Sequence, residues 1–346
     1  MNKPESTPSL DSVINQINKA YGPGSLVWLG SSEINREVET IPTGSFGLDL
    51  ALGVGGYPKG RVVEIYGPEM SGKTTLALAA VANTQRAGSI AAFVDAEQSF
   101  NAAYAKVLGV DIDRLLISQP STGEEALEIV DQLVSSGDVG IIIVDSVAAL
   151  VPKAELDGEM GDSHIGLQAR LMSQAMRKLT AKMAHGKTTV IFINQLREKV
   201  GVMFGSPEVT SGGKALKFYA SVRLDVRRVD SIKVGTEVVG NKVKVKVVKN
   251  KVAAPFKETI FPLVYAVGID RDGELLEVGE RKGLITKAGG GWYYVGQFRL
   301  GRGEGAKTFL RENPNVADQI RDAIRNNATS LEIQSEEPAA TITDAA

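Results

Sequence analysis

The chain has 346 residues, of which 43% are apolar, and this is enough to bury a large core in one or more domains. It has no cysteine, which excludes disulfides, thiolate metal sites and cysteine nucleophiles, and its two histidines leave little for a histidine metal site. No stretch reaches the roughly 18 apolar residues of a membrane span, and the start MNKPESTPSL lacks the apolar core of a signal peptide, so we expect a cytoplasmic protein without membrane contact.

The net charge of -2 hides an uneven distribution of charge along the chain. Residues 170–251 hold 18 lysines or arginines against 5 acidic residues, so the remainder of the chain is acidic. A basic stretch of this kind is compatible with nucleic-acid binding, and an ordinary solvated basic face is the alternative.

Apolar residues at helical spacing predict a helix over residues 10–21, which the sequence GPG then ends. A long segment rich in turn formers separates this helix from the first strand of the core. We therefore expect residues 1–35 to form an N-terminal arm that packs against something beyond its own core, such as a neighbouring subunit.

Apolar strands alternate with helices through the centre of the chain. We expect strands at 61–67, 89–97, 140–146 and 188–195, helices from 74, from a capping box at 121–124 and over 167–184, and β-rich segments at 217–228 and 242–249. Strands that are apolar throughout and alternate with helices are typical of a parallel sheet covered on both faces. Residues 36–268 are therefore predicted to form an α/β core with a mostly parallel central sheet flanked by helices.

The pattern changes after Phe261 to short pieces separated by glycines, followed by a helix near 314–326. This predicts a small C-terminal α+β domain over residues 269–327. The segment 328–346 is polar, net acidic and poor in large apolar groups, so we expect a disordered tail.

The stretch GPEMSGKT, Gly67 to Thr74, fits the phosphate-loop pattern G-x-x-x-x-G-K-[ST] between a predicted strand and a predicted helix. Its backbone N-H groups and the helix N-terminus attract phosphate, Lys73 can reach the outer phosphates, and the Thr74 hydroxyl can bind Mg²⁺. A structural turn is the alternative. The predicted nucleotide contacts are Gly67, Pro68, Glu69, Met70, Ser71, Gly72, Lys73, Thr74 and Thr75.

Three further polar residues end predicted core strands. Asp145 follows GIIIV and suits a Walker B carboxylate for the metal, although a lone Asp there is often a turn residue. Glu97 ends FVDAE and could activate water for attack on a γ-phosphate, whereas Asp95 is expected to be structural. Gln195 could sense the γ-phosphate, and a buried hydrogen bond to a turn is its alternative role.

Two long loops, 155–166 and 196–215, are expected to leave the sheet on the same side. The second is rich in glycine and holds apolar residues that have no evident core to join, which is typical of a functional or disordered loop. Arg170, Ser173 and Arg177 share one face of the helix that follows the first loop, and a solvated surface is the alternative explanation.

The sequences of several segments, and their order along the chain to about residue 326, resemble those of one family. The matching stretches are TGSFGLDLALGVGGYPKGRVVEIYGPEMSGKTT, DSVAALVPKAEL, GLQARLMSQAMRKLT, INQLREKVGVMFGSPE, GGKALKFYASVRLDVRR and KVKVVKNKVAAPFK. They resemble the RecA family of bacterial recombinases. The resemblance implies a RecA-type P-loop ATPase that uses ATP and Mg²⁺ and assembles as a helical filament on single-stranded DNA.

The resemblance also implies roles for individual residues. Glu97 is the general base, Tyr104 stacks on adenine near Asn101, and Lys249 and Lys251 reach the γ-phosphate of the neighbouring subunit. Gln195 and Phe218 couple the nucleotide to the loops and to the interface. The implied DNA-binding residues are Ile165, Arg170, Ser173, Arg177, Arg197, Lys199, Val200, Ser211, Gly212, Gly213 and Lys214.

The family further implies pairing with homologous double-stranded DNA, strand exchange in recombinational repair, and self-cleavage of a LexA-type repressor in the SOS response. A gateway for duplex DNA would use Arg281, Lys282, Lys287, Arg299 and Arg302, with a solvated surface as the alternative. A hexameric helicase, a clock-type ATPase and a structural filament with negligible turnover are the competing functions. The chain departs from the family pattern at Pro23, Gln98, Asn101, Glu198, Lys214 and Glu304.

Overall fold

The computed structural model describes residues 8–28, 38–159, 164, 166–183, 186–198 and 208–333. Its central sheet has the strand order β12 (Gly268–Ile269), β11 (Glu258–Val264), β10 (Glu237–Asn250), β9 (Val222–Val234), β3 (Val62–Gly67), β7 (Thr189–Glu198), β6 (Val139–Asp145), β4 (Ile90–Asp95) and β5 (Leu115–Ser118), and β8 (Glu208–Thr210) pairs with β7. Pairing is parallel from β9 through β3, β7, β6 and β4 to β5 and antiparallel from β9 to β12.

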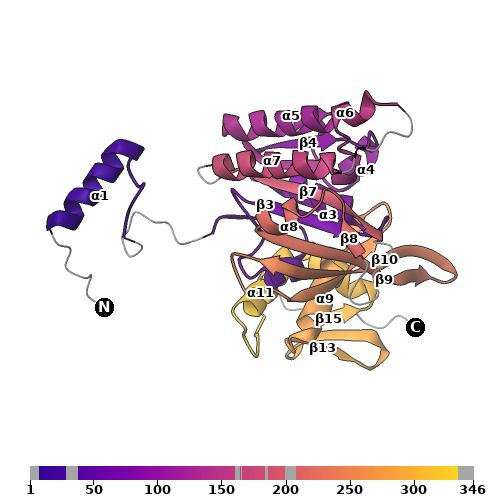
Figure 1. Cartoon of the computed structure of the whole chain (residues 1–346). Coiled ribbons are helices and arrows are strands. Elements are labelled where there is room, and N and C mark those ends of the chain that lie inside the picture. The colour runs from indigo at the N-terminus through magenta and orange to yellow at the C-terminus, as the bar shows by residue number, and fades with distance from the viewer. Residues whose placement is uncertain are drawn as a thin grey trace. The chain divides into compact units, whose positions relative to one another are not determined.

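Helices cover both faces of this sheet (Figure 1). Ile141 and Ile143 of β6 pack into one apolar core with α2 (Phe46–Leu52), α3 (Lys73–Arg86) and α4 (Ala102–Val107). Ile142 and Val144 point the other way, toward α5 (Gly123–Ser136), α7 (Leu167–Met183) and α8 (Ala215–Tyr219). Because these strands are buried on both faces, their sequences are apolar throughout and do not alternate between apolar and polar residues. The predicted α/β fold class is confirmed.

The parallel register brings four strand ends to one edge of the sheet. Gly67 of β3 lies opposite Gln195 of β7, and Asp95 of β4 lies opposite Asp145 of β6. Ligands of open α/β sheets bind beyond the carboxyl ends of the strands. The fold therefore places the polar residues that end these strands, and the loops that follow them, at one place.

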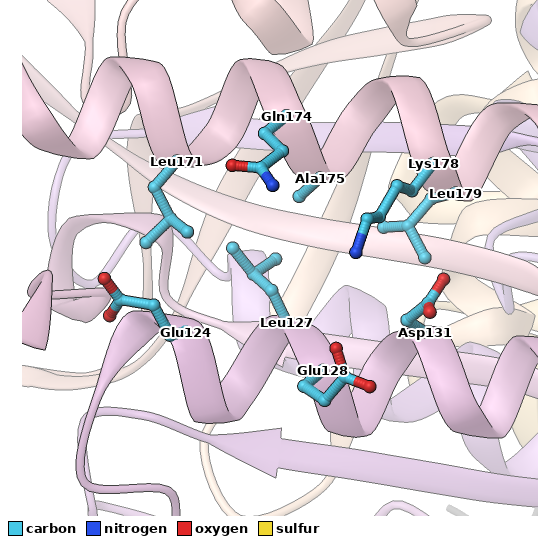
Figure 2. A pocket seen from close by; sticks show the side chains of 9 residues that line it. All are labelled: Glu124, Leu127, Glu128, Asp131, Leu171, Gln174, Ala175, Lys178 and Leu179. Carbon is cyan, nitrogen blue, oxygen red and sulfur yellow. The ribbon is translucent and has the colours of Figure 1, made fainter.

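The helices α5 and α7 pack against each other on the outer face of the sheet. Figure 2 shows Leu127 and Leu171 pointing toward one another between the two helices. The cavity of about 160 Å³ between them is also lined by Glu124, Glu128, Asp131 and Lys178. Asp131 pairs with Lys182 at 2.6 Å. This cavity lies between helices and not at the carboxyl edge of the sheet, so it is separate from the predicted site.

Three local predictions need correction. Residues 217–219 belong to α8 and not to a strand, because their two buried neighbours Ala215 and Leu216 form the apolar side of a short helix. The N-cap of α5 is Thr122, one residue later than predicted, and its side chain accepts from the Glu125 N-H. The loop predicted over 196–215 is structured at both ends, since β7 continues to Glu198 and pairs antiparallel with β8.

The C-terminal part has its own three-stranded sheet and apolar core. Its elements are α9 (Arg271–Arg281), β13 (Ile285–Ala288), β14 (Trp292–Val295), β15 (Phe298–Arg302), α10 (Glu304–Glu312) and α11 (Pro314–Arg325). Leu331 and Ile333 pack against this core, so the segment predicted as tail begins with residues that belong to the domain. The rest of that segment, 334–346, lies outside the described residues.

Residues up to 39 form a separate unit that contains α1 (Pro8–Tyr21). Leu10 and Val13 are 40% and 45% exposed, and α1 buries no residue. Its apolar face therefore has no burying partner among residues 8–28 and 38–39, the described part of this unit. No helix in the described ranges has the length and apolar character needed to cross a membrane.

A buried carboxylate joins the C-terminal domain to the core. Glu274 of α9 accepts hydrogen bonds from the N-H groups of Phe46 and Gly47 and from the Ser45 hydroxyl, at the start of α2. Burial raises the pKa of Glu274 to about 7, against the lowering effect of these donors. Burial likewise raises the pKa of nearby Asp49 to about 7.

These pKa values predict a pH dependence of stability. An unfolded glutamate ionises near its ordinary value of 4.5, so the folded chain holds an extra proton between that pH and about 7. The contribution of Glu274 protonation to the free energy of unfolding is therefore fully present below pH 4.5 and is lost as the pH rises to about 7. We expect Glu274→Gln, which does not titrate, to be less stable than the wild type at pH 5 and to recover by about 1–3 kcal/mol relative to it at pH 8.

The measurement is the free energy of urea unfolding at the two pH values. Part of the slope remains in the variant because Asp49 still titrates. The matched control is Glu277→Gln on the same helix, where the carboxylate pairs with Lys242 at the surface. If the free energies of unfolding of Glu274→Gln and the wild type differ by the same amount at both pH values, Glu274 does not have the raised pKa.

Candidate nucleotide and nucleic-acid site

The phosphate loop connects β3 to α3 at the carboxyl edge of the sheet. A Cβ on Gly67 would lie 2.1 Å from the carbonyl oxygen of Val226, so only glycine allows the loop to pass β9 this closely. Gly72 caps α3 with a φ of 97°, which also favours glycine. The helix N-terminus therefore opens directly into the loop formed by Gly67, Pro68, Glu69, Met70 and Ser71.

Lys73 lies folded onto its own loop. Its Nζ donates to the carbonyl oxygens of Gly67 at 3.1 Å and Pro68 at 2.6 Å. Burial lowers the pKa of Lys73, and the carboxylates of Asp145, Glu97 and Glu69 oppose this shift. The Ser71 hydroxyl is buried and lacks a hydrogen-bond partner among the described residues. A buried ammonium, an unsatisfied hydroxyl and a helix N-terminus suit a phosphate group.

Thr74 and Asp145 form the expected pair for a metal ion. The Thr74 hydroxyl donates to the Asp145 carboxylate at 2.8 Å. Burial raises the pKa of Asp145 to about 6, while the bond from Thr74 lowers it. Hydroxyl and carboxylate oxygens are the ligands that Mg²⁺ prefers, so these two residues fit Mg²⁺ next to the phosphate loop.

Glu97 is held by two side chains at the same edge. Gln195 Nε2 donates to its Oε1 at 2.9 Å, and the Ser146 hydroxyl donates to the same oxygen. The backbone N-H groups of Ala96 and Glu97 donate to the carbonyl oxygen of Asp145. The predicted general base, metal ligand and sensor are therefore in one cluster, with Gln195 in contact with Glu97 and not with a turn.

Asp95 has the structural role expected from the sequence. Its carboxylate is 1% exposed and accepts from the N-H groups of Ser99 and Phe100 and from Gln119. These bonds shape the turn between β4 and α4. This turn directs α4, and with it Tyr104, toward the phosphate loop.

A cavity of about 240 Å³ lies between the phosphate loop and the strands β10 and β11. Tyr104 lines it and bonds through its hydroxyl to Thr75 Oγ1 at 2.8 Å. Sequence reasoning missed the opposite wall, because no motif marks its residues. They are Asn241, Val243, Leu263 and Tyr265.

Asn101 has a structural explanation that the sequence pattern alone did not provide. Its side chain accepts from the Tyr104 N-H at 2.9 Å and caps α4. Asparagine and aspartate are equally good N-caps, so the departure from an acidic residue at this position leaves α4 and Tyr104 in place.

Lys249 and Lys251 do not meet the phosphate loop of their own chain. Strand register places Lys249 opposite Arg223, which lies opposite Glu64, three residues before Gly67. Lys249 Nζ donates to the carbonyl oxygens of Lys217 and Phe218, and Lys251 Nζ donates to that of Phe218. Burial, followed by the charges of Lys251 and Arg223, lowers the pKa of Lys249 to about 8. The Phe218 side chain is 65% exposed.

The described ends of both loops adjoin α7: Gly166 directly precedes the helix, and Gly212 bonds to Gln168 within it. Arg170 and Arg177 are exposed on α7, while Ser173 is half-buried and donates to the Ala169 carbonyl oxygen. Ile165, Lys199 and Val200 lie outside the described residues. Arg197, Gly213 and Lys214 are exposed at the described ends of the second loop.

The second loop is anchored to α7 through its glycines. Gly212 and Gly213 have φ angles of 78° and 75°, and a Cβ on either would lie within 2.8 Å of Val147 or Ala169. The Gly212 N-H donates to Gln168 Oε1 at 3.2 Å. A phosphate contact by this N-H therefore requires the bond to Gln168 to open.

The residues considered for a duplex gateway are all exposed on the C-terminal domain. Arg299 stacks over Trp292 at 4.7 Å and Lys287 over Tyr293 at 5.4 Å. Arg281 ends α9, Lys282 follows it and Arg302 ends β15, and all three are exposed. Glu304 pairs with Lys307 at 3.1 Å, so its negative charge is partly offset.

The chain matches the family model of the RecA N-terminal domain over residues 8–270 and that of the RecA C-terminal domain over residues 273–329. A curated Protein RecA from Acidothermus cellulolyticus is 61% identical over 318 residues, which cover 92% of both chains. The Protein RecA from Frankia alni is 62% identical over 92% of this chain and 91% of its own. The one from Salinispora tropica is 61% identical over 93% of this chain and 92% of its own. The chain belongs to the RecA family.

Proposed function

We propose that this protein is a DNA-dependent ATPase that assembles into a helical filament on single-stranded DNA and pairs it with homologous duplex DNA. Membership of the RecA family supports a recombinase and ATPase role at the general level. The single observation that carries the proposal is the bond from Gln195 to Glu97. This bond joins the start of the second loop to the candidate general base. DNA bound at the loop can therefore change the rate of ATP hydrolysis.

Each residue of the cluster has a chemical task in ATP hydrolysis. Lys73 would turn from the Gly67 and Pro68 carbonyl oxygens to the outer phosphates, and Thr74 and Asp145 would hold Mg²⁺, which supplies positive charge to the phosphates. Glu97 orients water and accepts its proton. Tyr104, near Asn101, would stack on adenine in the cavity beside the phosphate loop.

Assembly would complete the site. Lys249 and Lys251 lie away from their own phosphate loop, next to the exposed Phe218. We propose that they contact the γ-phosphate held by a neighbouring chain, as an arginine finger supplied in trans does. Hydrolysis then occurs only where chains are stacked, and the exposed apolar face of α1 is available for the same assembly.

DNA would be gripped through its phosphates at the edge where the loops leave the sheet. Arg170, Ser173, Arg177 and Arg197 supply side chains there, and Ser211, Gly212, Gly213 and Lys214 follow at the other end of the second loop. Ile165, Lys199 and Val200 complete the proposed set, with Ile165 and Val200 inserted between bases. Contacts to phosphate leave base edges free, which pairing with a homologous strand requires.

The same membership extends the proposal to recombinational repair in the cytoplasm and to self-cleavage of a LexA-type repressor in the SOS response. A strand-exchange assay between circular single-stranded DNA and homologous linear duplex tests the core of the proposal. We expect ATP-dependent joint molecules, and a failure to form them with active protein would contradict it.

Two substitutions separate binding from chemistry. Lys73→Ala removes a phosphate contact, so we expect loss of both ATP binding and hydrolysis. Glu97→Gln keeps the size of the side chain and leaves the phosphate loop intact, so ATP-dependent DNA binding should persist while kcat falls at least about 100-fold. Nucleotide binding and steady-state hydrolysis are measured for both. Normal hydrolysis by Glu97→Gln would show that another group is the base.

Mixing inactive variants tests whether the lysines act in trans. One variant carries Lys73→Ala, and the other carries Lys249→Ala with Lys251→Ala. In an equal mixture about a quarter of the interfaces join an intact phosphate loop to intact lysines, so hydrolysis should recover to roughly that fraction of the wild-type rate. Each variant alone is the control. No recovery in mixtures that co-assemble on DNA would place the lysines in cis or outside the reaction.

A further inference from the structure

One buried carboxylate near the site takes no part in the chemistry described above. Glu64 lies in the middle of β3, between β7 and β9, and is 0% exposed. Its Oε1 accepts from Asn194 Nδ2 at 2.9 Å, and its Oε2 accepts from the Arg223 guanidinium. A buried charge is expensive even when paired, and an apolar residue would serve packing alone at least as well. Its two contacts therefore point to a role beyond packing.

Asn194 uses every polar atom of its side chain. Nδ2 donates to Glu64 and also to the carbonyl oxygen of Ser211 at 3.0 Å, while Oδ1 accepts from the Gln195 N-H at 2.9 Å. Asn194 is 0% exposed, so water does not replace a lost partner. One amide thus holds the backbone at Gln195, just before the second loop, to the backbone at Ser211, near the other end of the loop, and it supports the direct bond from the Ser211 N-H to the Gln195 carbonyl oxygen.

The acceptor on Glu64 decides the orientation of that amide. Two donors, Asn194 and Arg223, face the carboxylate, and both of its oxygens can accept. A glutamine would present an N-H to one of them. If the Asn194 amide then turned over, its oxygen would face the Ser211 carbonyl and its N-H groups would face the Gln195 N-H, so both loop bonds would be lost.

We infer that Glu64 is a positioning residue for DNA-stimulated hydrolysis, because it fixes the Asn194 amide that ties Ser211 of the second loop to Gln195 and so to Glu97. This inference rests on the proposed function. The chain of contacts is continuous: Ser211 to Asn194, the Asn194 side chain to the Gln195 backbone, and Gln195 to Glu97. Glu64 does not line the nucleotide cavity, and it bonds to Asn194 and Arg223, so its link to Gln195 and Ser211 runs through Asn194.

The test is ATP hydrolysis by Glu64→Gln with and without single-stranded DNA. We expect DNA-free hydrolysis and KM for ATP within about twofold of the wild type, and a DNA-stimulated kcat at least about tenfold lower, since coupling between sites is typically worth 5- to 150-fold. The matched control is Glu274→Gln, which also removes a buried carboxylate that accepts from several donors but lies at the C-terminal junction. It should retain full stimulation.

Glu64→Asp keeps the buried charge with a side chain too short to reach both donors, and it should give a stimulation between those of the wild type and Glu64→Gln. If Glu64→Gln does not fold, Glu64→Asp decides the matter alone. Stimulation at the wild-type level in the folded variant, or an equal loss in Glu274→Gln, would overturn the inference. If DNA does not stimulate the wild type, the proposed function itself fails, and no coupling exists for Glu64 to carry.

Discussion

The parallel register of β3, β7, β6 and β4 is the constraint on which the candidate site depends. It sets Gly67 beside Gln195 and Asp95 beside Asp145, so the phosphate loop, the candidate metal ligand and the candidate sensor share one edge although they are far apart in sequence. Because the strands are buried on both faces, a slip in register would expose apolar side chains and unpair backbone groups. The core therefore fixes the geometry of the candidate site.

A single strand, β7, connects the candidate nucleotide site to the loop that is proposed to bind DNA. Gln195 is near its last buried residue, and Arg197 and Glu198 continue into the second loop. Asn194 bonds to Ser211, and Gly212 bonds to Gln168 of α7, so the returning end of the loop is held to both the sheet and the helix. In the proposed coupling, movement of the loop would reach Glu97 through three hydrogen bonds: Ser211 to Asn194, Asn194 to Gln195, and Gln195 to Glu97.

The sequence predicted the residues that belong to local patterns and missed those that tertiary contact brings in. Lys73, Thr74 and Asp145 were found because a phosphate loop and a strand-ending acid have fixed local contexts. Tyr265 and Leu263 carry no such signal, since only the pairing of β10 with β11 brings them to the cavity beside the phosphate loop. The roles of Glu64 and Asn194 were likewise hidden, because a polar residue inside an apolar strand does not reveal its partner.

The departures from the family pattern also needed the structure. Asn101, one of these departures, caps α4 as an aspartate would. Residues 217–219 have a strand-like sequence pattern but belong to the short helix α8. The carbonyl groups at the C-terminal end of α8 accept hydrogen bonds from Lys249 and Lys251. These lysines would have to leave α8 in order to contact a neighbouring γ-phosphate, which would link assembly to the position of Phe218.

Thermodynamic reciprocity gives the most direct test of the central claim that Gln195 couples DNA to nucleotide. The measurement is the affinity for single-stranded DNA with and without a non-hydrolysable ATP analogue, in the wild type and in Gln195→Ala. If the claim is right, the analogue tightens DNA binding several-fold in the wild type, and this ratio falls to about one in Gln195→Ala with nucleotide-free binding unchanged. An undiminished ratio in Gln195→Ala would contradict it.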